Sequence, residues 1–134
     1  MLQAMATSLA GQTDEALAIF DEALDEGRTS LADEILAEIT HSKAEFLGEL
    51  GRTEEALKLF ESASELFASC GRNERIADIA MQTGQIHAKS WNFTLSQLSY
   101  ENAVREYRNC FDPIKVARAR DSLASVLDRS EEHT

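Results

Sequence analysis

Apolar residues recur along the chain in stripes with helical spacing, and the most regular stripe carries a small residue, an aromatic residue and a second small residue. Its clearest copy is Ala56, Phe60 and Ala63, at positions i, i+4 and i+7, which share one face of a helix. Small residues on that face let a neighbouring helix approach closely, and the aromatic ring fills the space beside it. The pattern predicts amphipathic helices that pack against one another.

This stripe occurs three times at an interval of 40 residues. The segments GQTDEALAIFDEA from Gly11 and GRTEEALKLFESA from Gly51 agree at nearly every structural position, and WNFTLSQLSYENA from Trp91 keeps the later part of the pattern. A long internal period is typical of repeat proteins, whereas a coiled coil would show uninterrupted heptads. Gly27 and Gly71 also interrupt the apolar stripes. Stacked helix hairpins therefore fit better than a coiled coil.

Capping signals give the first set of helix boundaries. Thr13 and Thr53 are predicted to cap the helices that carry the first two copies of the stripe, because acidic residues follow each threonine. Gly11 and Gly51 are predicted to end the preceding helices. The first of these preceding helices would be short and would span residues 1–10.

Partner helices are predicted between the copies of the stripe. Ser30 is the expected N-cap of a helix over Leu31–Leu50, and Asn73 opens a second helix that runs to about Ser90. Asp112 followed by Pro113 is typical of the start of a third helix. About seven helices result, and their short connections predict that consecutive helices run antiparallel.

With 134 residues, the chain is expected to fold as a single helical repeat domain over residues 1–130. The predicted units are repeats at roughly 1–29, 30–71 and 72–111, a C-terminal capping helix at 113–129 and a frayed tail at 130–134.

The net charge bears on the kind of partner. The 13 basic and 24 acidic residues give a formal charge of -11, so the chain would be repelled by nucleic acid and would gain nothing from an anionic membrane surface. No apolar run approaches the roughly 20 residues that cross a bilayer, and Met1–Ala10 lacks the pattern of a signal peptide. Two cysteines are too few for a disulfide framework. We therefore expect a cytoplasmic protein.

The repeats resemble the tetratricopeptide repeat, whose helix pair has a turn glycine followed by small, aromatic and small residues at these intervals. Gly84 stands at the family's small mid-helix position, and Ala44 and Ala124 stand one period away on either side. Trp91 replaces the turn glycine and Ser96 the first small residue of the third copy. The period is longer than the family's usual ~34 residues and is similar to a lengthened variety found in adaptor proteins and bacterial regulators. The resemblance implies an all-α, right-handed solenoid of antiparallel helix hairpins.

The resemblance also implies a concave groove, lined by the first helix of each pair, where a peptide or helix of a partner binds. By the 40-residue register, the groove residues are Glu38, His41, Glu45, Asp78, Met81, Gln85, Lys89, Arg118, Asp121 and Ser125. Glu45 and Gln85 stand where the family's clamp for a peptide carboxylate has asparagines. We therefore expect a basic or amphipathic protein segment as the ligand. The alternative is that these residues form an ordinary solvated face.

Other residues with reactive or metal-binding side chains show no spacing that indicates a metal or cofactor site. His41, His87 and His133 have no ligand-like spacing with one another or with the cysteines. Cys70 and Cys110 are one period apart, so we expect two small buried residues at equivalent points of adjacent repeats, without a disulfide.

These observations favour a protein-interaction module and predict no enzyme activity and no cofactor, because the acidic runs fall on the outward helix face and no catalytic motif occurs. Trp91 is expected to pack between repeats, with an exposed anchor for a partner as the alternative. Two other functions stay open. One alternative is the sensor region of a larger bacterial transcriptional regulator or signalling protein. The other is a self-associating repeat protein, expected to form a homodimer through its N-terminal end because no polar cap is expected there.

Overall fold

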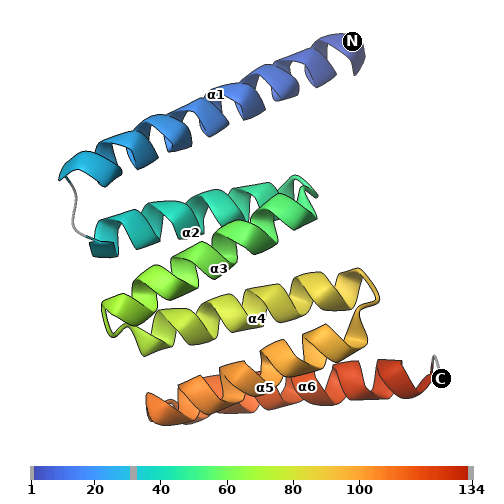
Figure 1. The fold of residues 1–134 in the computed structure, drawn as a ribbon. Helices are drawn as coiled ribbons and strands as arrows, with labels where there is room; N and C mark the ends of the chain where they lie inside the picture. The colour runs from blue at the N-terminus through green and yellow to red at the C-terminus, as the bar shows by residue number, and fades with distance from the viewer. Residues whose placement is uncertain (1, 31–32, 133–134) are drawn as a thin grey trace.

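The computed structural model describes the backbone of residues 2–30 and 33–132, and the side chains of residues 11–26 and 33–132. Within these ranges the chain is all helical. The helices are α1 (Leu2–Ser30), α2 (Asp33–Glu49), α3 (Thr53–Ser69), α4 (Asn73–Lys89), α5 (Phe93–Asn109) and α6 (Pro113–Glu132). Consecutive helices run antiparallel and stack in a row (Figure 1). The predicted all-α solenoid is confirmed, with six helices in the described part of the chain instead of about seven.

A single type of turn joins α2 to α6 and recurs every 20 residues. Its left-handed residues are Gly51, Gly71, Trp91 and Phe111, with φ between 56° and 80°. At the first turn the Gly51 amide donates to the Gly48 carbonyl (3.1 Å) and the Arg52 amide to the Leu47 carbonyl (3.0 Å). This is the Schellman arrangement, which satisfies the last carbonyls of a helix. Since α2, α3, α4 and α5 each have 17 residues, equal helices and equal turns produce a regular stack.

The capping predictions are partly wrong. Arg52 is the residue before α3 and makes no side-chain capping bond, whereas Thr53 is already helical and its hydroxyl donates to the Gly51 carbonyl (3.4 Å). With the left-handed turn at Gly51, α3 therefore begins one residue earlier than predicted. The prediction for the last helix is confirmed, because α6 begins at Pro113 and the Asp112 carboxylate accepts the Lys115 amide (3.1 Å).

The predicted break between a helix at residues 1–10 and the first copy of the stripe is also wrong. Gly11 and Thr13 lie inside α1, which continues to Ser30, the residue expected to cap the next helix. A glycine inside a helix costs only about 1 kcal/mol, and the alanines and leucines around Gly11 favour the helix. The side chain of Ser30 and residues Leu31 and His133 lie outside the described residues.

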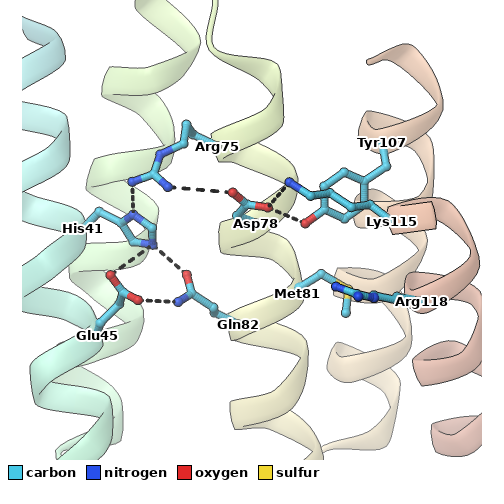
Figure 2. A pocket seen from close by; sticks show the side chains of 9 residues that line it. All are labelled: His41, Glu45, Arg75, Asp78, Met81, Gln82, Tyr107, Lys115 and Arg118. Atoms are coloured by element: carbon cyan, nitrogen blue, oxygen red, sulfur yellow. Dashed lines mark hydrogen bonds and ion pairs between the residues drawn. The ribbon is translucent and has the colours of Figure 1, made fainter. Parts of the chain in front are cut away.

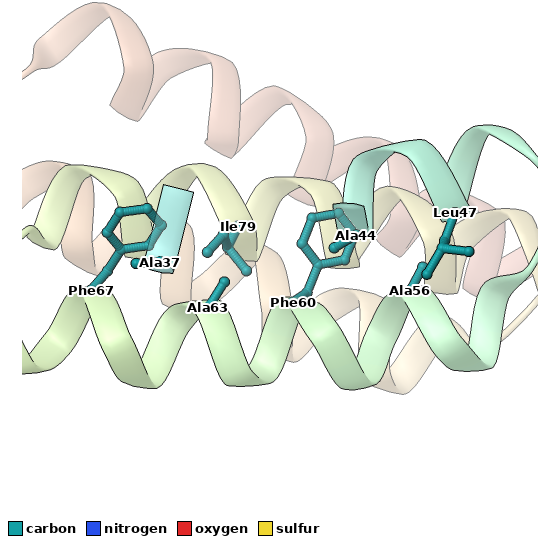
Figure 3. Close-up of a cluster of buried hydrophobic side chains, with 8 residues drawn as sticks. All are labelled: Ala37, Ala44, Leu47, Ala56, Phe60, Ala63, Phe67 and Ile79. Atoms are coloured by element: carbon teal, nitrogen blue, oxygen red, sulfur yellow. The ribbon is translucent and has the colours of Figure 1, made fainter. Parts of the chain in front are cut away.

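The small–aromatic–small stripe is the seam between helices, as predicted. The largest apolar cluster joins α2, α3 and α4 (Figure 3). Its buried members are Ala37, Ala44, Leu47, Ala56, Phe60, Ala63, Phe67 and Ile79. The equivalent residues of α5, Ser96, Tyr100 and Ala103, are also buried.

The stripe on α1 is less well covered than the other two. Ala16, Phe20 and Ala23 are only half-buried, although the Phe20 ring lies 5.8 Å from that of Phe46. The reason is that α1 packs against α2, whereas α3 and α5 each pack between two helices. Part of the α1 stripe is therefore accessible. Ile19, one residue before Phe20, is 65% exposed.

The third repeat shows why its departures from the pattern are tolerated. The Ser96 hydroxyl is buried and donates to the Gly84 carbonyl (2.8 Å), so this polar side chain has a partner. A Cβ atom at Gly84 would lie 2.6 Å from Cε1 of Tyr100. The absence of a side chain at Gly84 therefore lets α4 approach the Tyr100 ring.

Trp91 was expected to pack between repeats, but it does not. It is 61% exposed, and its ring contacts Phe93 (5.7 Å between centroids) and the Arg129 guanidinium (5.7 Å). Cys70 and Cys110 were expected to be buried, but they are half-buried free thiols at the ends of α3 and α5. The ends of these helices are less covered than their central turns.

We predict that Gly84→Ala lowers the free energy of unfolding by about 1–3 kcal/mol, because the added methyl group overlaps the Tyr100 ring. Gly48→Ala is the matched control. A Cβ there would meet its nearest atom at 3.9 Å, so the change should be neutral or stabilising by up to about 1 kcal/mol. Urea unfolding followed by circular dichroism measures both. Equal effects of the two substitutions would contradict the close packing at Gly84.

Candidate functional site

An open hollow of about 380 Å³ lies across one face of the stack, and we call it the polar groove (Figure 2). Its lining comes mainly from α2, α4 and α6, with one residue of α5. The residues are His41, Glu45, Arg75, Asp78, Met81, Gln82, Tyr107, Lys115 and Arg118.

A chain of hydrogen bonds crosses the groove from α4 to α2. Arg75 Nη2 lies 3.0 Å from His41 Nδ1, and His41 Nε2 lies 2.6 Å from Gln82 Oε1. Because a guanidinium can only donate, Nδ1 accepts and Nε2 carries the proton that is donated to Gln82. The Gln82 amide then donates to Glu45 Oε2 (2.9 Å). Every link has a fixed direction, and the chain ends on a carboxylate.

The His41 ring also belongs to the core. It is only 3% exposed and lies edge-on to Phe60 and Phe67, with centroids 5.8 and 6.0 Å away. His41 was predicted to face the groove, and both its ring nitrogens do meet groove residues. Its apolar ring atoms are buried beneath them, so His41 forms the floor of the groove.

Two cations on this face repeat with the 40-residue period. Arg75 lies over the Phe67 ring (5.2 Å) and pairs with Glu38 (2.5 Å). One period later Lys115 lies over the Tyr107 ring (5.6 Å) and pairs with Asp78 (3.9 Å) and, more closely, with Glu74. Each cation therefore joins the aromatic seam to an acid on the preceding helix of the groove.

Asp78 links the two halves of this network. It accepts the Tyr107 hydroxyl (2.5 Å) and pairs with Arg75 at 3.8 Å as well as with Lys115. Burial and the bond to Asp78 raise the pKa of Tyr107 far above its usual value, and the negative charges of Asp78 and nearby acids act in the same direction. Tyr107 is therefore held as a neutral hydrogen-bond donor.

Arg118 differs from the other cations of the groove. It is exposed at the α6 wall, and among the described residues it forms no ion pair. Half-buried Met81 of α4 lines the same part of the hollow (Figure 2). An unpaired cation beside a flexible apolar side chain is suited to contact an external group.

The residues predicted to line the groove are brought together in part. Five line it: His41, Glu45, Asp78, Met81 and Arg118. Glu38 adjoins it through Arg75. Asp121 and Ser125 line a separate hollow of about 260 Å³ beside Arg129. Gln85 and Lys89 are exposed on the last turns of α4 and line neither hollow.

Four groove residues were missed from the sequence: Arg75, Gln82, Tyr107 and Lys115. A signal for three of them was present. Arg75 and Lys115 are cations one period apart, and Tyr107 is one period after Phe67. The prediction followed a single narrow stripe on each helix, whereas a groove wall includes the neighbouring stripe.

No protein-family model matches the sequence, and no curated protein sequence matches it. Solved structures do match the fold. One is the crystal structure of BtubC (BKLC) from P. vanneervenii, with a TM-score of 0.77, 19% sequence identity and coverage of 92% of this chain. The fold is a helical repeat. The aligned part is 51% of BtubC, so the chain spans about half the length of that protein. No helix in the described residues is long and apolar enough to cross a membrane.

We predict that Tyr107→Phe changes how stability depends on pH. A raised folded-state pKa contributes stability below the unfolded value of about 10, and this contribution is lost as the pH rises above that value. The wild type should therefore lose unfolding free energy above about pH 10 more steeply than Tyr107→Phe. Urea unfolding between about pH 8 and pH 11 tests this. Tyr100→Phe is the comparison: burial also raises the pKa of Tyr100, but its hydrogen-bond partner is Ser96 and not a carboxylate, so this substitution should flatten the slope less than Tyr107→Phe does. Identical slopes for wild type and Tyr107→Phe would refute the assignment.

Proposed function

We propose that the chain is a protein-interaction module of the tetratricopeptide type, which holds a helix or peptide of a partner protein in the polar groove. The observation that carries this proposal is the wall made by Arg118 and Met81. They are accessible, and Arg118 has no ion pair within the described residues, while the other side chains around them are tied into a hydrogen-bonded floor. A rigid floor with a free cation and an apolar contact is pre-organised for binding.

The charges of the groove specify the kind of segment. Exposed Glu45 lies at the α2 wall and Arg118 at the α6 wall, with Met81 on α4 between these helices. A complementary ligand carries a basic side chain toward Glu45, an apolar side chain toward Met81 and an acidic side chain toward Arg118. We therefore propose an amphipathic segment that lies across the three helices. In this proposal the groove binds and does not catalyse, because its titratable groups serve as structural hydrogen-bond partners.

We expect Arg118→Glu to weaken capture of the partner about tenfold, a loss of ~1.4 kcal/mol, because charge repulsion replaces attraction at the α6 wall. The measurement is affinity capture from cell extract, quantified by mass spectrometry against the wild type. Arg105→Glu is the matched control, since Arg105 lines a hollow formed by α3, α4 and α5 and not the groove. Lys89→Glu, outside the groove on α4, is a second control. The same partners at the same yield from Arg118→Glu and the controls would move the binding site away from the groove.

Self-association through α1 is a second candidate, favoured by the half-buried stripe of Ala16, Phe20 and Ala23 beside exposed Ile19. The same stripe is fully covered by a partner helix on α3 and α5. A second copy of the chain could cover it on α1.

If the chain self-associates in this way, Ile19→Glu should convert a dimer to a monomer without a loss of helicity, because Ile19 is 65% exposed and contributes little to the core. Sedimentation velocity measures the mass, with Leu95→Glu as the control at an exposed leucine of α5. A wild type that sediments as a monomer at all concentrations would exclude this candidate.

A further inference from the structure

The turn between α5 and α6 forms a second open hollow, of about 440 Å³, which we call the Phe111 site. It lies at the end of the helices and shares no lining residue with the polar groove. Phe111, Pro113, Val116 and Ala117 give it an apolar surface, and the Phe111 ring is 91% exposed. The remaining lining residues are Arg108, Asp112 and Arg120. An exposed aromatic side chain of this kind is typical of a contact surface.

The equivalent turn between α3 and α4 shows which side chains the turn requires in order to fold. One period before Arg108, Phe111 and Arg120 stand an alanine, a glycine and an alanine, at positions 68, 71 and 80. The backbone of the two turns is the same, with φ of 70° at position 71 and 56° at Phe111. Three side chains that the turn itself does not require therefore build the Phe111 site.

Phe111 also costs the fold some stability. A left-handed backbone conformation is unfavourable by roughly 1–2 kcal/mol for a residue with a Cβ atom, and glycine avoids this cost. The exposed ring recovers little of it by burial. A strained residue that the fold does not need suggests a role outside folding.

The charges of the Phe111 site oppose those of the whole chain. Arg108 and Arg120 are exposed, and neither forms an ion pair with a carboxylate in the part of the chain that the structure describes. The one carboxylate of the site, Asp112, accepts the amide of Lys115 as the cap of α6. Two unpaired guanidinium groups beside an apolar surface, in a chain of formal charge -11, are complementary to an acidic ligand.

We propose that the Phe111 site binds a segment of a partner protein in which an aromatic or long aliphatic side chain is flanked by carboxylates. The apolar side chain packs on Phe111 and Val116, and the carboxylates pair with Arg108 and Arg120. This ligand differs from that of the polar groove, so the two sites can be tested separately. An anionic membrane has similar charges but would be repelled by the other faces of this acidic chain.

The test begins with selection of peptides from a random displayed library on the full chain. The library is first depleted on the triple variant Arg108→Ala, Phe111→Gly, Arg120→Ala, which restores the residues of the α3–α4 turn. Enriched peptides should combine acidic residues with tryptophan, phenylalanine or leucine. Binding of one enriched peptide is then measured by fluorescence anisotropy. Relative to wild type, it should weaken at least about tenfold in the single variant Phe111→Gly and in the double variant Arg108→Ala, Arg120→Ala. It should also weaken with added salt.

Several controls make the outcome decisive. Phe111→Gly should unfold at the same or a higher urea concentration than wild type, so a loss of binding would not reflect loss of the fold. Arg105→Ala, elsewhere on α5, should bind the peptide as wild type does, and a lysine version of the peptide should not bind. The proposal is overturned if no acidic peptide is enriched, if the lysine version binds equally, if the variants bind normally, or if the chain prefers anionic vesicles to the peptide.

Discussion

The close contact between a seam aromatic residue and a small residue on the preceding helix determines the rest of this structure. Tyr100 requires Gly84, since a Cβ there would lie 2.6 Å from the ring, and one period earlier Phe60 packs in the same buried cluster as the small residue Ala44 (Figure 3). Each such contact fixes how closely two helices approach. Because helices of equal length and turns of one type repeat it, α2, α4 and α6 come to lie in a row. The polar groove is a consequence of that row.

The groove is also connected chemically to the seam. Phe67 and Tyr107 end the seam stripe on α3 and α5, and each carries a cation on its ring, Arg75 and Lys115. These cations pair with acids on the preceding helix of the groove, so a polar network lies directly on the apolar core. Hydrogen bonds and ion pairs among such groups stabilise one arrangement over others, although Arg75 Nε is buried without a hydrogen-bond partner. The network therefore keeps most groove side chains in place and leaves Arg118 as the accessible cation of the groove, beside Met81 and opposite exposed Glu45.

Much of the fold could be predicted from the sequence because the stripe and the turn glycines at positions 51 and 71 are local signals that repeat. The break expected at Gly11 failed for a physical reason. A glycine permits a left-handed turn but does not force one, and a turn is stabilised only when the two helices it joins pack together. The site was harder to predict. The 40-residue register found His41 and Arg118, but burial of the His41 ring and the bonds of Gln82 depend on tertiary packing that no spacing reveals.

Differences between equivalent positions of the repeats are more informative about function than their agreement. Where the repeats agree, as at Ala56 and Phe60, the residue is explained by packing. At the four left-handed turn positions the backbone conformation favours glycine, and two of the four positions are glycine. Trp91 and Phe111 occupy the others, both exposed and both at a conformational cost. Arg129 stacks on the Trp91 ring, whereas Phe111 has no such covering among the described residues. Of the two side chains, Phe111 therefore exposes more apolar surface that no contact within the described residues explains. A partner segment with an apolar side chain flanked by carboxylates, as proposed above, would cover it.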